Sequence, residues 1–280
     1  MFDFNDSIVN NAAGRPLICA HRGVSAGNIP CNTIAAFSAA LAQGADMIEL
    51  DVTESRDGRF FVFHPGKESA HLKSHRLISA MKGDKVKKLR YVNQDNDETQ
   101  FGVDELCDIL DFLKGKCYIN LDKFWTDIPG LSKEIRRVGV EKQVLVKTAL
   151  KDKYLEALKE CAADFMFLPI VREKDEVTDM LRSQGINCVG AEVLFETENA
   201  PVASRRYIDA MHEKGMLLFA NAIVYNYKEV LSAGHNDDIS AAGEPERGWG
   251  WLLDRFDIIQ TDWCGMMKHF MEHREGSQRK

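Results

Sequence analysis

The sequence predicts an α/β fold, a (β/α)8 TIM barrel with a small insertion after the second strand. Three observations support this prediction. Short β-branched or aromatic runs alternate with segments of helical spacing along the 280 residues. Eight such runs occur, and their near-continuous apolar character is typical of parallel strands that are buried on both faces. Glycine follows several of the helical segments, as it does just beyond the ends of many helices.

The expected strands follow one another in a regular order. They comprise residues 17–20, 46–52, 117–121, 143–146, 165–170, 188–194, 216–220 and 257–260. Amphipathic helices are expected between them, including residues 33–43, 103–113, 154–163, 175–184 and 204–213. Strands and helices that alternate eight times with right-handed crossovers close into a barrel. A doubly wound open sheet is the alternative that this pattern leaves open.

Two segments break the alternation. Residues 59–64 are expected to form an extra strand that pairs with the second strand through the turn at Arg56, Asp57 and Gly58. Residues 65–96 are polar, basic and irregular, which indicates an insertion over one end of the barrel. The second segment, residues 226–247, either carries function or is a solvated crossover. Because a plain barrel takes about 250 residues, we expect a single catalytic domain over residues 1–280.

Composition excludes several classes of partner. Thirty-six Lys and Arg against 43 Asp and Glu give a net charge of −7, which disfavours nucleic acid because phosphate backbones need a basic face. No apolar run approaches the roughly 18 residues of a membrane span, so no stable membrane insertion is expected. The seven cysteines are scattered without a CxxC pair, and the acidic start lacks the basic region of a signal peptide. We therefore expect a cytoplasmic protein with a small-molecule substrate, a removed signal peptide being the alternative.

Polar residues gather where the expected strands end, which is where barrels of this type carry their chemistry. Glu49 and Asp51 lie two apart in the second strand, so they point to the same face. Buried carboxylates need a cation, either a structural ion-pair partner or a divalent metal. All-oxygen ligands favour Mg²⁺, Ca²⁺ or Mn²⁺ over Zn²⁺. We expect one divalent cation at this site, Mg²⁺ or Ca²⁺.

The same strand ends carry imidazoles and cations. His21 and His64 flank the acidic pair, a placement that favours proton transfer. Two imidazoles, a hard metal and several cations suit a phosphodiester, whereas a carbohydrate hydrolase would need only the paired acids. The candidates for substrate binding are Arg22, Lys123, Lys147, Glu192, Asn221 and Trp263. Lys147 and Glu192 could instead pair with each other across the barrel.

These residues carry a family resemblance. Between His21 and His64 the sequence contains, in order, HRG, NT, AF, GAD, IELDV, DG and H. This pattern resembles that of the glycerophosphodiester phosphodiesterase family. Residues 259–262 are similar to the last barrel strand of the same family. The resemblance implies a (β/α)8 barrel and metal-dependent hydrolysis of a glycerophosphodiester to sn-glycerol 3-phosphate and an alcohol. It further implies that His21 and His64 are the general acid/base pair, that Arg22 binds phosphate, and that Glu49 and Asp51 bind the metal.

The sequence departs from the family pattern at three places. Cys31 replaces the Glu that usually precedes Asn-Thr, and Pro65 replaces the Asp that usually follows the second histidine. The third strand of the family tends to carry a Glu with a Lys two residues later, whereas here Asp122 and Lys123 are adjacent. We expect Asp122 to be the third metal ligand. Lys123 is expected to reach the phosphate only if the strand ends between these two residues.

Three alternatives for the function stay open. The substrate could carry another head group, such as an inositol or sugar phosphodiester, and cleavage could pass through a cyclic phosphate. Alternatively, this chain could belong to another functional class, as a non-catalytic barrel that binds a phosphate ligand and has lost turnover through Cys31 and Pro65. A metal-dependent isomerase or aldolase would need a Schiff-base lysine, for which Lys147 is the candidate.

Overall fold

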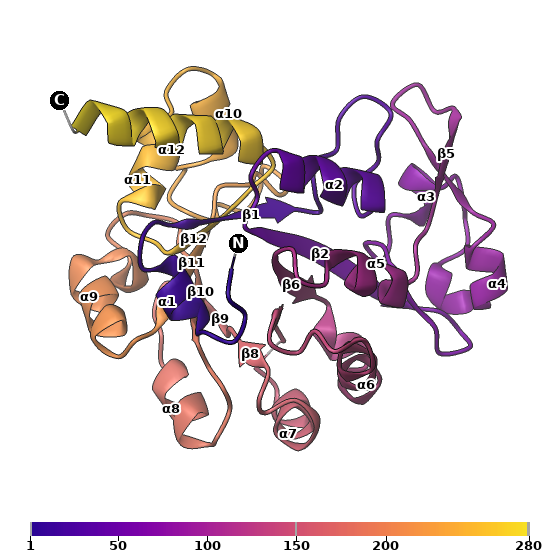
Figure 1. Ribbon diagram of the computed structural model, residues 1–280, viewed down its shortest axis with the longest axis horizontal. Coiled ribbons are helices and arrows are strands. Elements are labelled where there is room, and N and C mark those ends of the chain that lie inside the picture. The colour runs from indigo at the N-terminus through magenta and orange to yellow at the C-terminus, as the bar shows by residue number, and fades with distance from the viewer. Residues whose placement is uncertain (1, 149, 279–280) are drawn as a thin grey trace.

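A curled sheet forms the centre of the molecule (Figure 1) in the computed structural model, which describes residues 2–148 and 150–278. Nine strands follow one another in the order β8-β7-β6-β2-β1-β12-β11-β10-β9, and all neighbours in this order are parallel. These strands are β1 (Leu17–His21), β2 (Met47–Glu54), β6 (Tyr118–Asp122), β7 (Val144–Val146), β8 (Met166–Phe167), β9 (Ile170–Arg172), β10 (Gly190–Leu194), β11 (Leu217–Asn221) and β12 (Ile258–Thr261).

The expected fifth strand is divided into β8 and β9 by Leu168 and Pro169, because proline has no N–H to donate to a sheet. The two halves pair on opposite sides, β8 with β7 and β9 with β10. Phe167 also forms a parallel bridge with Cys188, and the Glu192 N–H donates to the Pro169 carbonyl at 3.0 Å. These contacts join the two ends of the strand order, which confirms the barrel and excludes the open sheet.

Helices surround the strands, and the five expected ones are confirmed with small changes at their ends. The outer helices are α2 (Ile34–Ala42), α5 (Leu106–Leu113), α6 (Ile128–Val138), α7 (Asp152–Cys161), α8 (Thr178–Ser183), α9 (Arg205–Glu213) and α12 (Cys264–Gln278). Shorter elements are η2 (Phe124–Thr126), η3 (Pro201–Ala203), α10 (Asp237–Ala241), η4 (Glu246–Gly250) and α11 (Trp251–Leu253). Residues 226–247 include α10, and whether this segment carries function or is a solvated crossover stays open.

The two faces of the strands belong to different apolar clusters. In β2, Ile48, Leu50 and Val52 pack into the large cluster that includes the outer helices. Met47 belongs instead to a second cluster with Leu17 and other residues from the start of their strands. Since side chains alternate along a strand, Glu49 and Asp51 share the interior face with Met47. The barrel interior is therefore apolar where the strands begin and polar where they end.

A short N-terminal helix, α1 (Ile8–Ala12), covers the ends at which the strands begin, and Figure 1 shows it over the centre of the sheet. Phe2 and Phe4 precede it, and their rings lie 5.2 and 5.1 Å from the ring of Tyr118. Ser7 caps the helix by accepting the Asn10 N–H at 3.1 Å. The sequence predicts no element here, because five residues are too few to show helical periodicity.

The insertion after β2 has a small core of its own. β3 (Phe60–Val62) pairs antiparallel with β2, as expected, and α3 (Glu68–His71), η1 (Ile78–Ala80) and α4 (Gly83–Val86) follow. The expected insertion is confirmed, but it contains regular elements and extends beyond residue 96, because it ends in a hairpin of β4 (Arg90–Val92) and β5 (Glu98–Gly102). Residues such as Phe61, Phe63 and Tyr91 form its core. In Figure 1 this part projects on the right.

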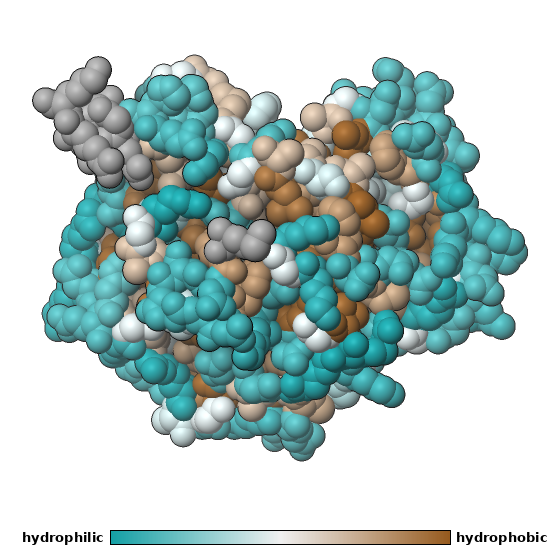
Figure 2. All heavy atoms as spheres, viewed as in Figure 1, coloured by the Kyte–Doolittle hydropathy of each residue, from teal (hydrophilic) through white to brown (hydrophobic). Residues whose placement is uncertain are grey.

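Several features bear on the environment of the chain. Among the residues described, none of the helices is both long and apolar enough to span a bilayer. The face drawn in Figure 2 is mostly hydrophilic, with apolar atoms in scattered places. All seven cysteines are free. The cytoplasmic location stays a prediction.

Candidate active site

A cavity of about 240 Å³ opens where the barrel strands end. Its lining includes nine of the residues predicted from the sequence, namely His21, Arg22, Glu49, His64, Asp122, Lys123, Lys147, Glu192 and Asn221. Asp51 lies beneath this surface and is fully buried. Trp263 is 48% exposed and is not among the lining residues, so its role in substrate binding stays a prediction.

Three carboxylates converge at this cavity. Asp51 of β2 and Asp122 of β6 are direct neighbours in the sheet, and one oxygen from each of Glu49, Asp51 and Asp122 lies within 4.8 Å of the others. Burial, together with the charge of Asp51, raises the pKa of Glu49 to about 7. The buried Oδ1 of Asp51 accepts no hydrogen bond from a described residue. A set of oxygen donors with an unused buried oxygen fits a hard divalent cation.

Arg22 and Asn32 hold the carboxylates of β2 in place. The Arg22 backbone N–H donates to Glu49 Oε2 at 3.1 Å, and its Nε lies 2.8 Å from Asp51 Oδ2. Asn32 donates from Nδ2 to the same Asp51 oxygen at 3.0 Å and is 1% exposed. Asn32 is thus a positioning residue that the sequence analysis noticed only as part of the family pattern.

The backbone at Arg22 and Gly23 explains why glycine follows the arginine. Arg22 and Gly23 have φ values of 58° and 77°, so the chain leaves β1 through two left-handed residues. A Cβ on Gly23 would lie 2.7 Å from the carbonyl carbon of Ala36, in the first turn of α2. Thr33 caps this helix by accepting the Ala36 N–H at 3.2 Å. The helix therefore packs closely enough against the turn to exclude any side chain at Gly23.

His21 is oriented by Asp262, which follows β12. Its Nδ1 donates to Asp262 Oδ1 at 2.8 Å. Burial lowers the pKa of His21, but the hydrogen bond to Asp262 and the charge of Glu49 outweigh it, so the pKa lies above 6.5. The sequence analysis placed Asp262 at a strand end without giving it a role. Its partner is 241 residues away in the chain, so only the closed barrel brings the two together.

His64 lies near the acidic triad, two residues beyond β3. Its Nδ1 donates to the Pro65 carbonyl at 2.9 Å, and its Nε2 lies 3.9 Å from Asp51 Oδ1. Burial lowers the pKa of His64, and the Arg22 and Lys123 cations add to this effect against the charge of Asp51. In both histidines Nδ1 is therefore engaged as a hydrogen-bond donor. This leaves Nε2 as the nitrogen that can exchange a proton with a ligand.

Lys123 reaches the cavity because β6 ends at Asp122. Lys123 has a φ of 62°, so the strict alternation of the strand stops there and its side chain turns back toward Asp122. Its Nζ lies 2.5 Å from Asp122 Oδ2 and 3.7 Å from Asp51 Oδ1. The condition stated for Lys123 in the sequence analysis is therefore met, although no described contact tests its binding to phosphate.

A buried hydrogen-bonded network lines the floor of the cavity. Lys147 Nζ donates to Glu192 Oε2 at 2.8 Å, which confirms the pairing that the sequence left open. Asn221 donates to the other Glu192 oxygen at 2.8 Å and accepts from Gln260 at 2.9 Å. Since the Lys147 and Glu192 side chains are each less than a tenth exposed, the pair is a buried ion pair.

Removal of one member of this pair should destabilise the barrel. We expect Lys147→Met to lower the free energy of unfolding by about 3 kcal/mol, because it leaves the Glu192 carboxylate buried without its cation. Denaturant unfolding followed by circular dichroism measures this change. The double variant Lys147→Met with Glu192→Leu is the control and should recover most of the loss. If both variants lose the same free energy of unfolding, the loss does not arise from the unpaired charge of Glu192.

The loop between β11 and α11 supports the His21 side of the cavity. Asp237, at the start of α10, accepts hydrogen bonds from the Thr261 hydroxyl at 2.6 Å, from the Asp262 N–H at 2.8 Å and from Trp249 Nε1 at 2.7 Å. Burial raises the pKa of Asp237 to about 6. The loop thus fixes the end of β12, and with it the aspartate that orients His21.

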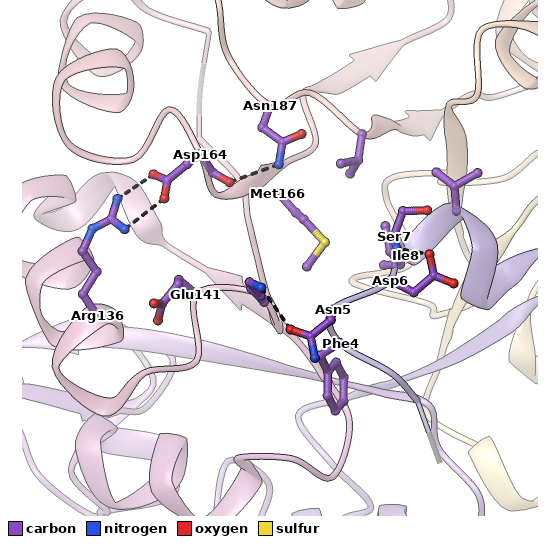
Figure 3. Close-up of a pocket in the computed structure, with 13 residues that line it drawn as sticks. Phe4, Asn5, Asp6, Ser7, Ile8, Arg136, Glu141, Asp164, Met166 and Asn187 are labelled. Atoms are coloured by element: carbon purple, nitrogen blue, oxygen red, sulfur yellow. Dashed lines mark hydrogen bonds and ion pairs between the residues drawn. The ribbon is translucent and has the colours of Figure 1, made fainter.

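A larger cavity lies at the other end of the barrel, where β7, β8 and β10 begin (Figure 3). Its volume is about 570 Å³. Within it, Arg136 holds Asp164 through two hydrogen bonds, and Lys142 donates to Asn5 at 3.0 Å. The groups predicted to transfer protons and to bind a metal lie at the opposite end, which makes the smaller cavity the candidate active site.

Comparison with known proteins finds short stretches of sequence similarity. A relative from Mycobacterium tuberculosis, named as a probable glycerophosphodiester phosphodiesterase 1, is 38% identical over 79 residues, and a glycerophosphodiester phosphodiesterase from Caldanaerobacter subterraneus is 54% identical over 50 residues. These stretches are short. The first covers 28% of this chain and 28% of the relative, and the second covers 18% of this chain and 20% of the relative.

Solved structures match over nearly the whole chain and support the fold. A glycerophosphoryl diester phosphodiesterase from Parabacteroides distasonis aligns with a TM-score of 0.72 and 18% identity, over 95% of this chain and 92% of that one. An Oleispira antarctica phosphodiesterase, solved with the product sn-glycerol-3-phosphate, aligns with a TM-score of 0.63 and 18% identity, over 93% and 98%. The family model for glycerophosphoryl diester phosphodiesterases matches residues 21–226. The chain therefore belongs to the glycerophosphoryl diester phosphodiesterase family.

Proposed function

We propose that this protein hydrolyses a glycerophosphodiester to sn-glycerol 3-phosphate and an alcohol at the cavity where the barrel strands end. The observation that carries the proposal is that His21 and His64 line the same cavity as the triad of Glu49, Asp51 and Asp122. Binding of a phosphate ester alone would need cations. Two imidazoles with fixed Nδ1 atoms add the means to move protons, which favours an enzyme over a binding protein.

Proton transfer is assigned to the two histidines as a pair. Hydrolysis needs one group that takes the proton of the nucleophile and one that gives a proton to the leaving alkoxide. His21 and His64 each hold Nδ1 in a hydrogen bond, to Asp262 and to the Pro65 carbonyl, so their rings are oriented before substrate arrives. Such orientation removes part of the entropy cost of reaching the reactive arrangement.

The charge of the phosphodiester is met by cations at the same place. Arg22 and Lys123 lie against Asp51, and we assign both to the phosphate oxygens. A divalent cation held by Glu49, Asp51 and Asp122 would polarise the phosphoryl oxygen. We assign Mg²⁺ or Ca²⁺ to this site because its donors are all oxygens. Lys147, Glu192 and Asn221 form the polar floor, where they can contact the hydroxyl groups of the substrate.

The proposal is tested by product analysis. The protein is incubated with glycerophosphocholine or glycerophosphoinositol in the presence of Mg²⁺ or Ca²⁺, and the products are followed by phosphorus NMR. Glycerol 3-phosphate as the phosphorus-containing product supports the proposal. A cyclic phosphate as the final product would instead assign cleavage by internal attack. If neither substrate is turned over with either cation, the proposed reaction is wrong.

The contact between His21 and Asp262 predicts a shift in pH dependence. Asp262 raises the pKa of His21, so Asp262→Asn should lower it and move the limb of the pH-rate profile that His21 sets to lower pH, by about one unit. The profile of kcat/KM measures this shift, and NMR titration of the imidazole checks its origin. Asp257→Asn is the matched control, because Asp257 holds the distant His212 at 3.0 Å. An unchanged profile in Asp262→Asn would contradict the positioning role.

A further inference from the structure

Lys123 contacts two of the three carboxylates that are assigned to the divalent cation. Its Nζ lies 2.5 Å from Asp122 Oδ2 and 3.7 Å from Asp51 Oδ1. The adjacency of Asp122 and Lys123 is a departure from the family pattern, and the left-handed φ of 62° at Lys123 brings the two side chains together. The ammonium and a divalent cation therefore seek contact with the same carboxylates.

The two oxygens of Asp51 are used differently. Oδ2 accepts a hydrogen bond from Asn32 at 3.0 Å and lies 2.8 Å from Arg22 Nε. Oδ1 is buried, and the side-chain nitrogens described within 4 Å of it are Lys123 Nζ at 3.7 Å and His64 Nε2 at 3.9 Å. Both distances are too long for a hydrogen bond. A divalent cation at Oδ1 would therefore lie beside the Lys123 ammonium, which itself offers this oxygen no hydrogen bond.

Lys123 has room to move, in contrast to the other lysine of the cavity. Lys147 is held by Glu192 at 2.8 Å, and its side chain is 5% exposed. The Lys123 side chain is 22% exposed, and it lines both the candidate active site and a neighbouring cavity of about 470 Å³ at the insertion. Trp125 lines both cavities as well, and its ring lies 5.2 Å from Lys123 Nζ. An aromatic face at this distance gives the ammonium a second favourable contact.

We infer that Lys123 is the resident counter-cation of the triad and exchanges with the divalent cation. The ammonium offsets part of the buried carboxylate charge, and two cations at one set of carboxylates repel each other. On exchange, Lys123 leaves Asp122, and its ammonium becomes available to the phosphate oxygens beside Trp125. This inference rests on the proposed function. It adds that the lysine reaches the phosphate only after the carboxylates have another cation.

Calorimetry of Mg²⁺ or Ca²⁺ binding without substrate tests the exchange. Lys123→Met keeps an unbranched side chain and removes the charge, so its affinity for the ion should exceed that of the wild type by about tenfold or more. Lys116→Met is the matched control, because Lys116 lies over the Phe112 ring at 3.8 Å and has no described ion pair. It removes the same charge and should bind the ion like the wild type. Unchanged or weaker binding in Lys123→Met, or binding in neither protein, would overturn the exchange.

Thermal unfolding gives a second readout of the same exchange. In the chelator-treated protein, Lys123→Met leaves the triad without its counter-cation and should lower Tm relative to the wild type. Saturating Mg²⁺ should then raise the Tm of Lys123→Met by more than it raises the Tm of the wild type, because tighter binding to the folded state stabilises it more. A smaller or equal rise in the variant would contradict the inference.

Binding of glycerol 3-phosphate shows where the ammonium goes. Mg²⁺ should raise the affinity of the wild type for this ligand, and the increase should be smaller by about fivefold or more in Lys123→Met, which lacks the released ammonium. An equal increase in both proteins would reject the transfer of Lys123 to the phosphate. None of these measurements requires turnover. Tighter ion binding in Lys123→Met without hydrolysis of any diester would retain the exchange and reject the proposed reaction.

Discussion

His21→Ala should lower kcat/KM for a phosphodiester by roughly 10² to 10⁴-fold, the range that general acid/base catalysis supplies. The loss is expected because His21 is held by Asp262 beside the acidic triad, and His64, the other imidazole of the cavity, has its own part in the proposed proton transfer. Steady-state kinetics on a bis-aryl phosphodiester measure the effect without dependence on the head group.

The control for this prediction is His212→Ala. His212 is also paired with an aspartate, Asp257, but it lies near the start of β12 at the far end of the barrel. Its removal should leave kcat/KM within about twofold of the wild type, since it contacts none of the groups in proposed roles. Thermal unfolding of both variants shows that the fold is retained. A loss smaller than tenfold in His21→Ala would rule out its part in proton transfer.

Removal of the divalent cation should have the second large effect. Metal ions contribute several kcal/mol of charge stabilisation, and about 1.4 kcal/mol corresponds to tenfold in rate, so chelation should lower kcat by roughly 10²-fold or more. Addition of Mg²⁺ or Ca²⁺ should restore the rate. Calorimetry of the chelator-treated protein with each ion gives the affinity, independent of any activity.

Asp51→Asn tests which residues hold the ion. Asp51 carries the buried oxygen that accepts no hydrogen bond from a described residue, so its loss should abolish measurable binding of the ion as well as the activity. Asp111→Asn, an exposed carboxylate on α5, has the same change in charge and should bind like the wild type. If Asp51→Asn binds the cation with unchanged affinity, the Glu49, Asp51 and Asp122 triad is not the metal site.

The sequence by itself determined the architecture and most of the site. Eight apolar runs with helical segments between them predict a parallel barrel, because each run must be buried on both faces. The two-residue spacing of Glu49 and Asp51 predicts that they share a face, and the structure has them within the acidic triad. These features depend on local periodicity and on the rule that strand ends meet at one edge of the barrel. That is why they can be recognised without coordinates.

Tertiary structure decided what depends on backbone turns and on contacts between distant segments. The left-handed backbone at Lys123 directs its side chain toward Asp122, which alternation alone would not predict. Asp262 meets His21 only because β12 closes the barrel beside β1. The insertion proved to have its own core, and the cavity beneath it exists only once Glu54, Glu68 and Trp125 are brought together. Such contacts join residues far apart in the chain, and hydrophobic periodicity contains no information about them.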